Sequence, residues 1–289
     1  MKMKRQRSGI AAALTLALGG VLLVGVNPGA LAAGGNNDFS CKPGAAHPDP
    51  VVLLHGGFAN KDEDLNFLQA SLAAQGYCTF SLTYGTIGGF PYVGGLAPTA
   101  QSGVQIANFI NQVQAATGAA KIDLVGHSTG AFMSLYVPKL DGVANEIGKV
   151  VAIAPPTQGL SGYGFLTLAQ DVIGSAELSQ IEQSLGTNNF DNLAVGSAGV
   201  NALDNGPITQ PGITYTIIVS QSDEIVTPWQ NSFVNEAGVT NETVQQFCPF
   251  DPVGHIGEAY DTNVWQMVTN ALDPATAAPI SPCVFGAPF

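Results

Sequence analysis

The stretch Ile122-Asp123-Leu124-Val125-Gly126-His127-Ser128-Thr129-Gly130 decides the fold of this chain. An apolar run typical of a buried strand leads into the pattern Gly-x-Ser-x-Gly, and a helix is expected to follow over residues 131–140. The turn of such a junction is so tight that the serine adopts strained backbone geometry, and the flanking glycines leave room that a Cβ would occupy. The serine oxygen then stands at a helix N-terminus, which favours negative charge. The stretch therefore predicts a nucleophilic Ser128.

Strands and helices alternate along the rest of the chain. Strands are expected at 50–54, 77–82, 149–154, 213–219 and 243–247. Helices are expected at 62–75, 99–117 and 261–272. This alternation predicts an α/β fold with a mainly parallel sheet, right-handed crossovers and helices on its faces. Residues 157–211 break the alternation, and we expect them to form a cap or lid, while a packed helix would use the same apolar residues.

A serine nucleophile needs a base that removes its proton and an acid that orients the base. His255 is the one histidine that follows the serine in the chain, and it lies in a turn beyond an expected strand. Of the other three histidines, His127 is expected to pack beside the turn, His55 to be structural and His47 to have no role in the site. His255 is therefore the predicted base.

The orienting acid is expected at the carboxyl end of a strand between Ser128 and His255. Asp223 fulfils this condition, because it lies four residues after the end of the strand expected at 213–219. Glu224 is a close rival, and Asp251 is a more distant one. We take Asp223 as the predicted acid.

A tetrahedral intermediate also needs two hydrogen-bond donors for its oxyanion. One is expected to be the backbone N–H of Thr129, directly after the nucleophile. The other is expected in the His55-Gly56-Gly57-Phe58 loop after the first strand, with Gly57 as first choice and Phe58 as second. The acidic run Asp62-Glu63-Asp64 is interpreted as the solvated first turn of a helix, rather than as a calcium site.

The N-terminal residues resemble a signal peptide. A basic start, an apolar run over about residues 10–26 and Ala30-Leu31-Ala32 predict cleavage after residue 32, while a membrane anchor or an uncleaved export signal is the alternative. The mature domain would then span 33–289 with five basic and 21 acidic residues, a net charge of −16, and no arginine. This charge argues against nucleic acid as a partner and favours a neutral or apolar substrate.

Four cysteines in an exported chain predict two disulfides, for which three pairings exist. We favour Cys41–Cys78 and Cys248–Cys283, because each pair would tie a chain end to a nearby strand.

Taken together, these segments resemble the secreted actinobacterial class 2 lipases. The resemblance lies in 49–58, in Gly76-Tyr77-Cys78, in the elbow around Ser128, in Ser222-Asp223-Glu224-Ile225-Val226-Thr227-Pro228 and in Phe247-Cys248-Pro249. Ala131 departs from the family, where a second glycine is expected, and Thr129 replaces a commoner glutamine. The resemblance implies an α/β-hydrolase fold with Ser128, Asp223 and His255 as catalytic triad.

The implied function is a secreted triacylglycerol lipase or esterase that works through an acyl-enzyme, without metal or cofactor. Its partner would be a lipid or small-molecule ester, met at a lipid–water interface, and the protein is expected to be a monomer. The nearer rival is a polyester hydrolase or a cell-envelope acyltransferase, which would use the same residues. The farther rival is a non-catalytic extracellular binding protein with the same fold.

Overall fold

The structure is a computed structural model that describes residues 35–185 and 193–289. The expected signal peptide, 1–32, and part of the expected cap, 186–192, lie outside the described residues. Within the described ranges, no helix has both the length and the apolar character needed to cross a bilayer.

A six-stranded parallel sheet forms the centre of the domain, with the strand order β2-β1-β3-β4-β5-β6. The strands are β1 (Val51–Leu54), β2 (Thr79–Ser81), β3 (Ile122–His127), β4 (Ile147–Ile153), β5 (Thr214–Val219) and β6 (Val239–Thr243). The inner strands β1 and β3 are buried on both faces. This burial explains their continuous apolar sequences.

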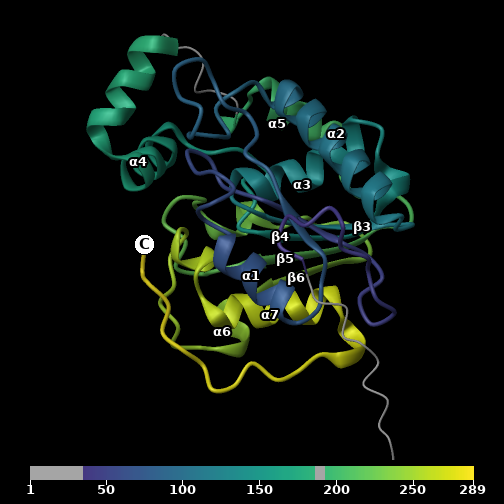
Figure 1. Cartoon of the computed structure of the whole chain (residues 1–289). Coiled ribbons are helices and arrows are strands. Elements are labelled where there is room, and N and C mark those ends of the chain that lie inside the picture. Colours follow the sequence, from purple (N-terminus) through teal and green to yellow (C-terminus); the bar gives the residue numbers. More distant parts are fainter. Residues whose placement is uncertain (1–34, 186–192) are drawn as a thin grey trace, which may run out of the picture. The chain divides into compact units, whose positions relative to one another are not determined.

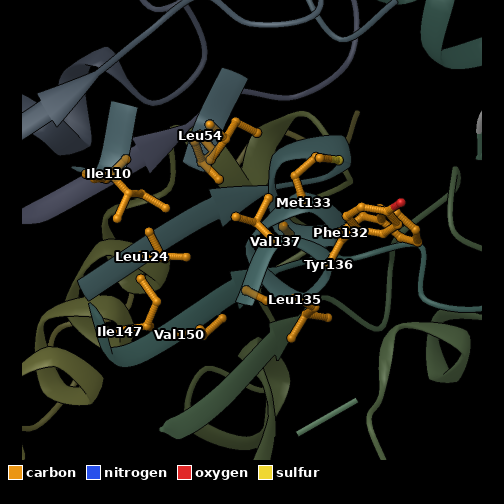
Figure 2. Packing of buried hydrophobic residues seen from close by; sticks show 14 of the residues in the cluster. Leu54, Ile110, Leu124, Phe132, Met133, Leu135, Tyr136, Val137, Ile147 and Val150 are labelled. Carbon is orange, nitrogen blue, oxygen red and sulfur yellow. The ribbon is translucent and has the colours of Figure 1, made fainter. Parts of the chain in front are cut away.

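Helices cover both faces of the sheet (Figure 1). The helices of the domain are α1 (Asn66–Ala74), α2 (Thr99–Thr117), α3 (Thr129–Leu140), α4 (Gly162–Leu185), α5 (Ala198–Asp204), α6 (Val244–Phe247) and α7 (Thr262–Leu272). On one face, α2 and α3 contribute Ile110, Leu135 and Val137 to the same buried cluster as Leu54 and Leu124 of the sheet (Figure 2). On the other face, α1 and α7 cover a second apolar cluster. The α/β-hydrolase fold expected from the sequence is confirmed.

Two expected elements were misplaced. The helix expected at 62–75 begins only at Asn66, and the acidic run before it is a loop. The strand expected at 243–247 is wrong, because β6 ends at Thr243 and residues 244–247 form α6. β6 is an edge strand that is buried only at its last residue, so its sequence lacks the apolar run of an inner strand.

Both expected disulfides are present. Cys41–Cys78 joins the N-terminal segment to the residue just before β2, with Cα atoms 5.9 Å apart. Cys248–Cys283 joins the end of α6 to the C-terminal segment, with Cα atoms 5.7 Å apart. Each bond closes a loop of the chain and so restricts the unfolded state.

Candidate active site

Ser128 lies in the sharp turn between β3 and α3, with φ 53° and ψ −119°. This backbone conformation is rare for a residue with a side chain, and the surrounding structure must hold it. A Cβ on Gly126 would overlap the backbone of Gly130, and a Cβ on Gly130 would overlap the carbonyl of Leu54. The two glycines of the motif are therefore required by close backbone contacts.

The structure brings Ser128, His255 and Asp223 together. The Ser128 Oγ lies 2.8 Å from the His255 Nε2, and the His255 Nδ1 lies 2.8 Å from the Asp223 Oδ2. All three residues are buried. In this chain of hydrogen bonds the serine hydroxyl donates to the ring, and the ring donates to the carboxylate.

The two rival acids have other positions. The second oxygen of Asp223, Oδ1, accepts from the N–H groups of Ile225 and Val226 at 2.8 and 2.9 Å. Glu224 accepts from the backbone N–H of His255 at 3.1 Å. Asp251 accepts from the backbone of Val253 and does not reach the ring. Glu224 and Asp251 therefore hold the histidine loop, while Asp223 contacts the imidazole.

The C-terminal residues also hold the histidine loop. The N–H of Gly254 donates to the carbonyl of Ala287, and the N–H of Gly257 donates to Phe289. Gly286 donates in turn to the Asp251 Oδ1 at 2.9 Å. The loop that carries His255 is thus packed against the last residues of the chain.

The expected oxyanion donors lie side by side. A Cβ on Gly57 would come within 2.8 Å of the Thr129 Oγ1, so the two residues are in direct contact. In the described part of the chain, neither the Gly57 N–H nor the Thr129 N–H has a hydrogen-bond acceptor. The N–H of Phe58, the second choice, donates to the carbonyl of Gly94 at 3.0 Å. Among the described residues, the N–H groups of Gly57 and Thr129 therefore both remain without an acceptor, next to Ser128.

A second histidine–carboxylate pair lies beside the triad, and sequence reasoning missed it. The His127 Nδ1 is 2.8 Å from the Asp64 Oδ1, and both side chains are buried. The interpretation of residues 62–64 as a solvated helix start is wrong for Asp64, because its loop turns inward at φ 61°. His55, expected to be structural, stacks on Tyr84 at 4.4 Å between ring centroids.

A cavity of about 250 Å³ opens in front of Ser128. Its apolar lining comes from Ala59, Leu168, Val172 and Ile256, of which Leu168 and Val172 belong to α4. The loop at 87–93 does not line this cavity, and its apolar residues Ile87, Phe90 and Val93 pack against the apolar cluster that includes Leu168 of α4.

Glu258 is fully buried close to the triad. Burial raises the pKa of its carboxyl well above the usual range, and the neighbouring Asp223 adds to this shift. Within the described residues, His127, His255 and Glu258 have ligand atoms near enough to share a metal ion. All four ring nitrogens of the two histidines already lie in hydrogen bonds within the protein, so an ion would have to break them.

The fold is that of an α/β-hydrolase, with a serine, a histidine and an aspartate joined by hydrogen bonds at the turn after β3. Comparisons with known proteins agree with this fold. The sequence model of the family described as Lipase (class 2) matches residues 48–151, which carry the His55–Phe58 loop and the elbow. Over these residues the chain matches the class 2 lipase family, which the resemblance in the sequence led us to expect. Asp223 and His255 lie outside the matched region.

Two relatives are triacylglycerol lipases, from Pseudarthrobacter phenanthrenivorans and Burkholderia plantarii. Each is 32% identical over 134 residues, or 45% of this chain. The match covers 39% and 34% of these relatives, so the chain matches well under half of their length.

Among solved structures, Aspergillus fumigatus lipase B aligns with a TM-score of 0.58 at 17% identity, over 81% of this chain and 54% of that one. A lipase-esterase related protein from Clostridium acetobutylicum aligns with a TM-score of 0.50 at 16% identity, over 80% of this chain and 97% of its own. At these identities the alignments show the shared fold.

Proposed function

We propose that this chain hydrolyses carboxylic esters of lipids through an acyl-enzyme on Ser128. The observation that carries the proposal is the continuous hydrogen-bond chain Ser128–His255–Asp223, with both links at 2.8 Å. It is supported by the class 2 lipase match around the nucleophile and by the triacylglycerol lipases among the relatives.

The proposed reaction follows from this geometry. His255 takes the proton of Ser128 as its Oγ attacks the ester carbonyl, and Asp223 stabilises the imidazolium that forms. The N–H groups of Gly57 and Thr129 receive the oxyanion. The imidazolium protonates the departing alcohol, and a water activated by His255 then releases the acid.

The substrate is proposed to be uncharged near the ester bond. The cavity has an apolar wall. Besides Asp64, which is paired with His127, its acidic lining residues are Glu63 and Asp171, and no lysine is among the described residues that line it. An anionic substrate group would be repelled there.

We test the proposed function with p-nitrophenyl esters of two to sixteen carbons, measured beside Ser128→Ala. Hydrolysis that disappears in the variant, while its circular dichroism and melting temperature stay unchanged, is the expected result. A maximum at eight carbons or more defines a lipase, and a maximum at two to four carbons defines a carboxylesterase. Equal rates for both proteins at every length would contradict the proposal and favour a transferase or a binding role, which product analysis with alcohol acceptors separates.

We further propose that the segment 157–211 acts as a cap over the acyl group. Leu168 of α4 is buried and lines the cavity, whereas Leu166 on the same helix is 45% exposed and does not. Leu168→Ala is expected to move the preferred chain length upward, and Leu166→Ala is the matched control. An unchanged preference in both variants would contradict a role of α4 in the acyl site.

We also propose that residues 1–32 direct export and are then removed. The two disulfides support an oxidising destination. Mass analysis of the protein from culture medium is expected to find a chain that begins close to residue 33, and an intact N-terminus would contradict cleavage.

A further inference from the structure

Both ring nitrogens of His127 face hydrogen-bond acceptors. The Nδ1 is 2.8 Å from the Asp64 Oδ1, and the Nε2 is 2.9 Å from the backbone carbonyl oxygen of His255. A carbonyl oxygen can only accept, so the Nε2 must carry a proton. A neutral ring would then present a lone pair on Nδ1 to a carboxylate oxygen, which is repulsive.

The carboxylate of Asp64 is held from its other side as well. Its Oδ2 accepts from the N–H of Gly56 at 2.6 Å. Burial alone would raise the pKa of Asp64 and lower that of His127, but their mutual attraction reverses both shifts. The geometry and the charges agree on an imidazolium paired with a carboxylate.

This pair connects the three loops of the proposed active site. His127 adjoins the nucleophile Ser128, Gly56 adjoins the oxyanion donor Gly57, and the third contact is the backbone of the base His255. Gly56 lies beside the pair, since a Cβ there would be in van der Waals contact, at 3.4 Å, with both the Asp64 Oδ2 and the His127 Nδ1. Through these hydrogen bonds, the pair links the three loops that carry the nucleophile, the base and the oxyanion donor.

We propose that His127 and Asp64 form a permanently charged pair that positions these three loops. His127 and Asp64 are positioning residues, because they act on the reacting groups through the backbone. The charge state of the pair does not depend on the proposed function, whereas its effect on turnover does.

Several other titratable side chains surround the pair. Asp223 raises the pKa of His127 further, and His55 helps to lower that of Asp64. The ring of His255 lies 5.1 Å from that of His127 between centroids. Tyr84, Glu258 and Tyr260 are also neighbours of the pair, and Glu63 and Asp171 line the same cavity as Asp64 and His127.

Nitrogen NMR tests the charge directly. The protein is labelled with ¹⁵N-histidine, which gives signals from four residues, and substitution of single histidines assigns them. Long-range proton–nitrogen spectra are recorded from pH 5 to 9, with free histidine in the tube as a reference that changes its charge. His127 is expected to keep both nitrogens protonated throughout this range. The spectrum of a neutral ring at pH 7 would overturn the proposal, including the case in which Asp64 carries the proton.

Kinetics test the positioning role. Asp64→Asn keeps the shape but removes the charge, and His127→Gln keeps a donor for the His255 carbonyl but loses the ion pair. Each is expected to lower kcat for p-nitrophenyl butyrate about 10- to 100-fold, with KM changed less than about threefold, as for misaligned reacting groups. Asp62→Asn is the matched control, because Asp62 is exposed and pairs with Lys61. A kcat in Asp64→Asn equal to that of the control would overturn the positioning role.

Two measurements keep the test independent of folding and of substrate choice. Thermal unfolding shows whether a variant is folded at the assay temperature, and the NMR spectrum of the unsubstituted protein needs no variant of the pair. If no ester is hydrolysed, the proposed function fails, and the rate at which a small phosphonate modifies Ser128 replaces kcat. An unchanged rate in Asp64→Asn would again overturn the role.

Discussion

At the scale of single residues, the assignment of the acid rests on which atom each carboxylate contacts. Asp223 contacts the imidazole of His255, while Glu224 contacts the backbone N–H of the same residue. Asp223→Asn is expected to lower kcat about 10³-fold or more, because an amide does not stabilise the imidazolium. Glu224→Gln retains an acceptor and is expected to lose less than about tenfold. Steady-state rates of the two variants decide between them, and the reverse order would exchange the roles of the two residues.

The contact between Gly57 and Thr129 gives a second prediction at this scale. Gly57→Ala places a methyl group 2.8 Å from the Thr129 Oγ1, and the Gly57 amide must shift away from the oxyanion. We expect kcat to fall about tenfold or more.

Thr129→Ala alone leaves the backbone N–H in place and is expected to have little effect. The double variant Gly57→Ala, Thr129→Ala is expected to recover most of the activity, because the obstructing hydroxyl is gone. A double variant as slow as Gly57→Ala would show that the contact is not the cause.

At the scale of elements, the elbow joins β3 to α3 through glycines that touch neighbouring backbone. Gly130→Ala would push the start of α3 away from the end of β1, because its Cβ overlaps the Leu54 carbonyl. We expect the free energy of unfolding to fall by about 3 kcal/mol. Gly88→Ala is the control, since nothing lies within 4 Å of a Cβ there. Urea unfolding measures both variants, and equal stability would mean that α3 accommodates the methyl group.

The bounds of some helices and strands could be predicted from the sequence, and those of others could not. The boundaries expected for the helix at 99–117 agree with α2, because this helix has a regular buried face and ends at Gly118 in the left-handed conformation. The sheet and the disulfides followed from apolar runs and cysteine positions. β6 was misplaced, because an exposed edge strand carries little apolar pattern.

The residues of the candidate site could be predicted where a motif or a position relative to other residues in the sequence identifies them. Ser128, Asp223 and His255 follow from a motif, a strand end and the single histidine after the elbow. Asp64 did not follow, because it lies 63 residues from His127 and its inward turn depends on tertiary contacts. A histidine inside a buried elbow is a signal that a partner for its ring must exist, although the sequence does not say which.

At the scale of the whole molecule, a buried carboxylate at the opposite end of β3 from Ser128 makes stability depend on pH. Burial raises the pKa of Asp123 to about 7, although Lys149 at 3.1 Å opposes the shift. The folded state holds this proton more tightly than the unfolded state. The proton therefore adds to the free energy of unfolding, and this stabilisation is complete in acid and is lost as the pH rises through 7. We expect a loss of roughly 2–4 kcal/mol between pH 4 and 8 from this group.

Asp123→Asn is expected to remove this part of the pH dependence and to flatten the curve of unfolding free energy against pH. Urea unfolding at pH 5 and pH 8 measures the free energy of unfolding, with Asp62→Asn as control, because Asp62 is exposed and pairs with Lys61. The prediction would be contradicted if the free energy of unfolding changed between pH 5 and pH 8 by the same amount in Asp123→Asn as in the unsubstituted protein.

The packing of the last residues against the histidine loop has a practical consequence for producing this protein. The carbonyl oxygen of Ala287 and a main-chain oxygen of Phe289 accept from the N–H groups of Gly254 and Gly257, on either side of His255. A purification tag fused after Phe289, or loss of these residues to an exopeptidase during harvest, would disturb the loop of His255, which lies more than thirty residues earlier in the chain. A tag placed ahead of Gly35 adjoins the edge strand β2 instead. Preparations that differ only in tag position should therefore be compared before their specific activities are pooled.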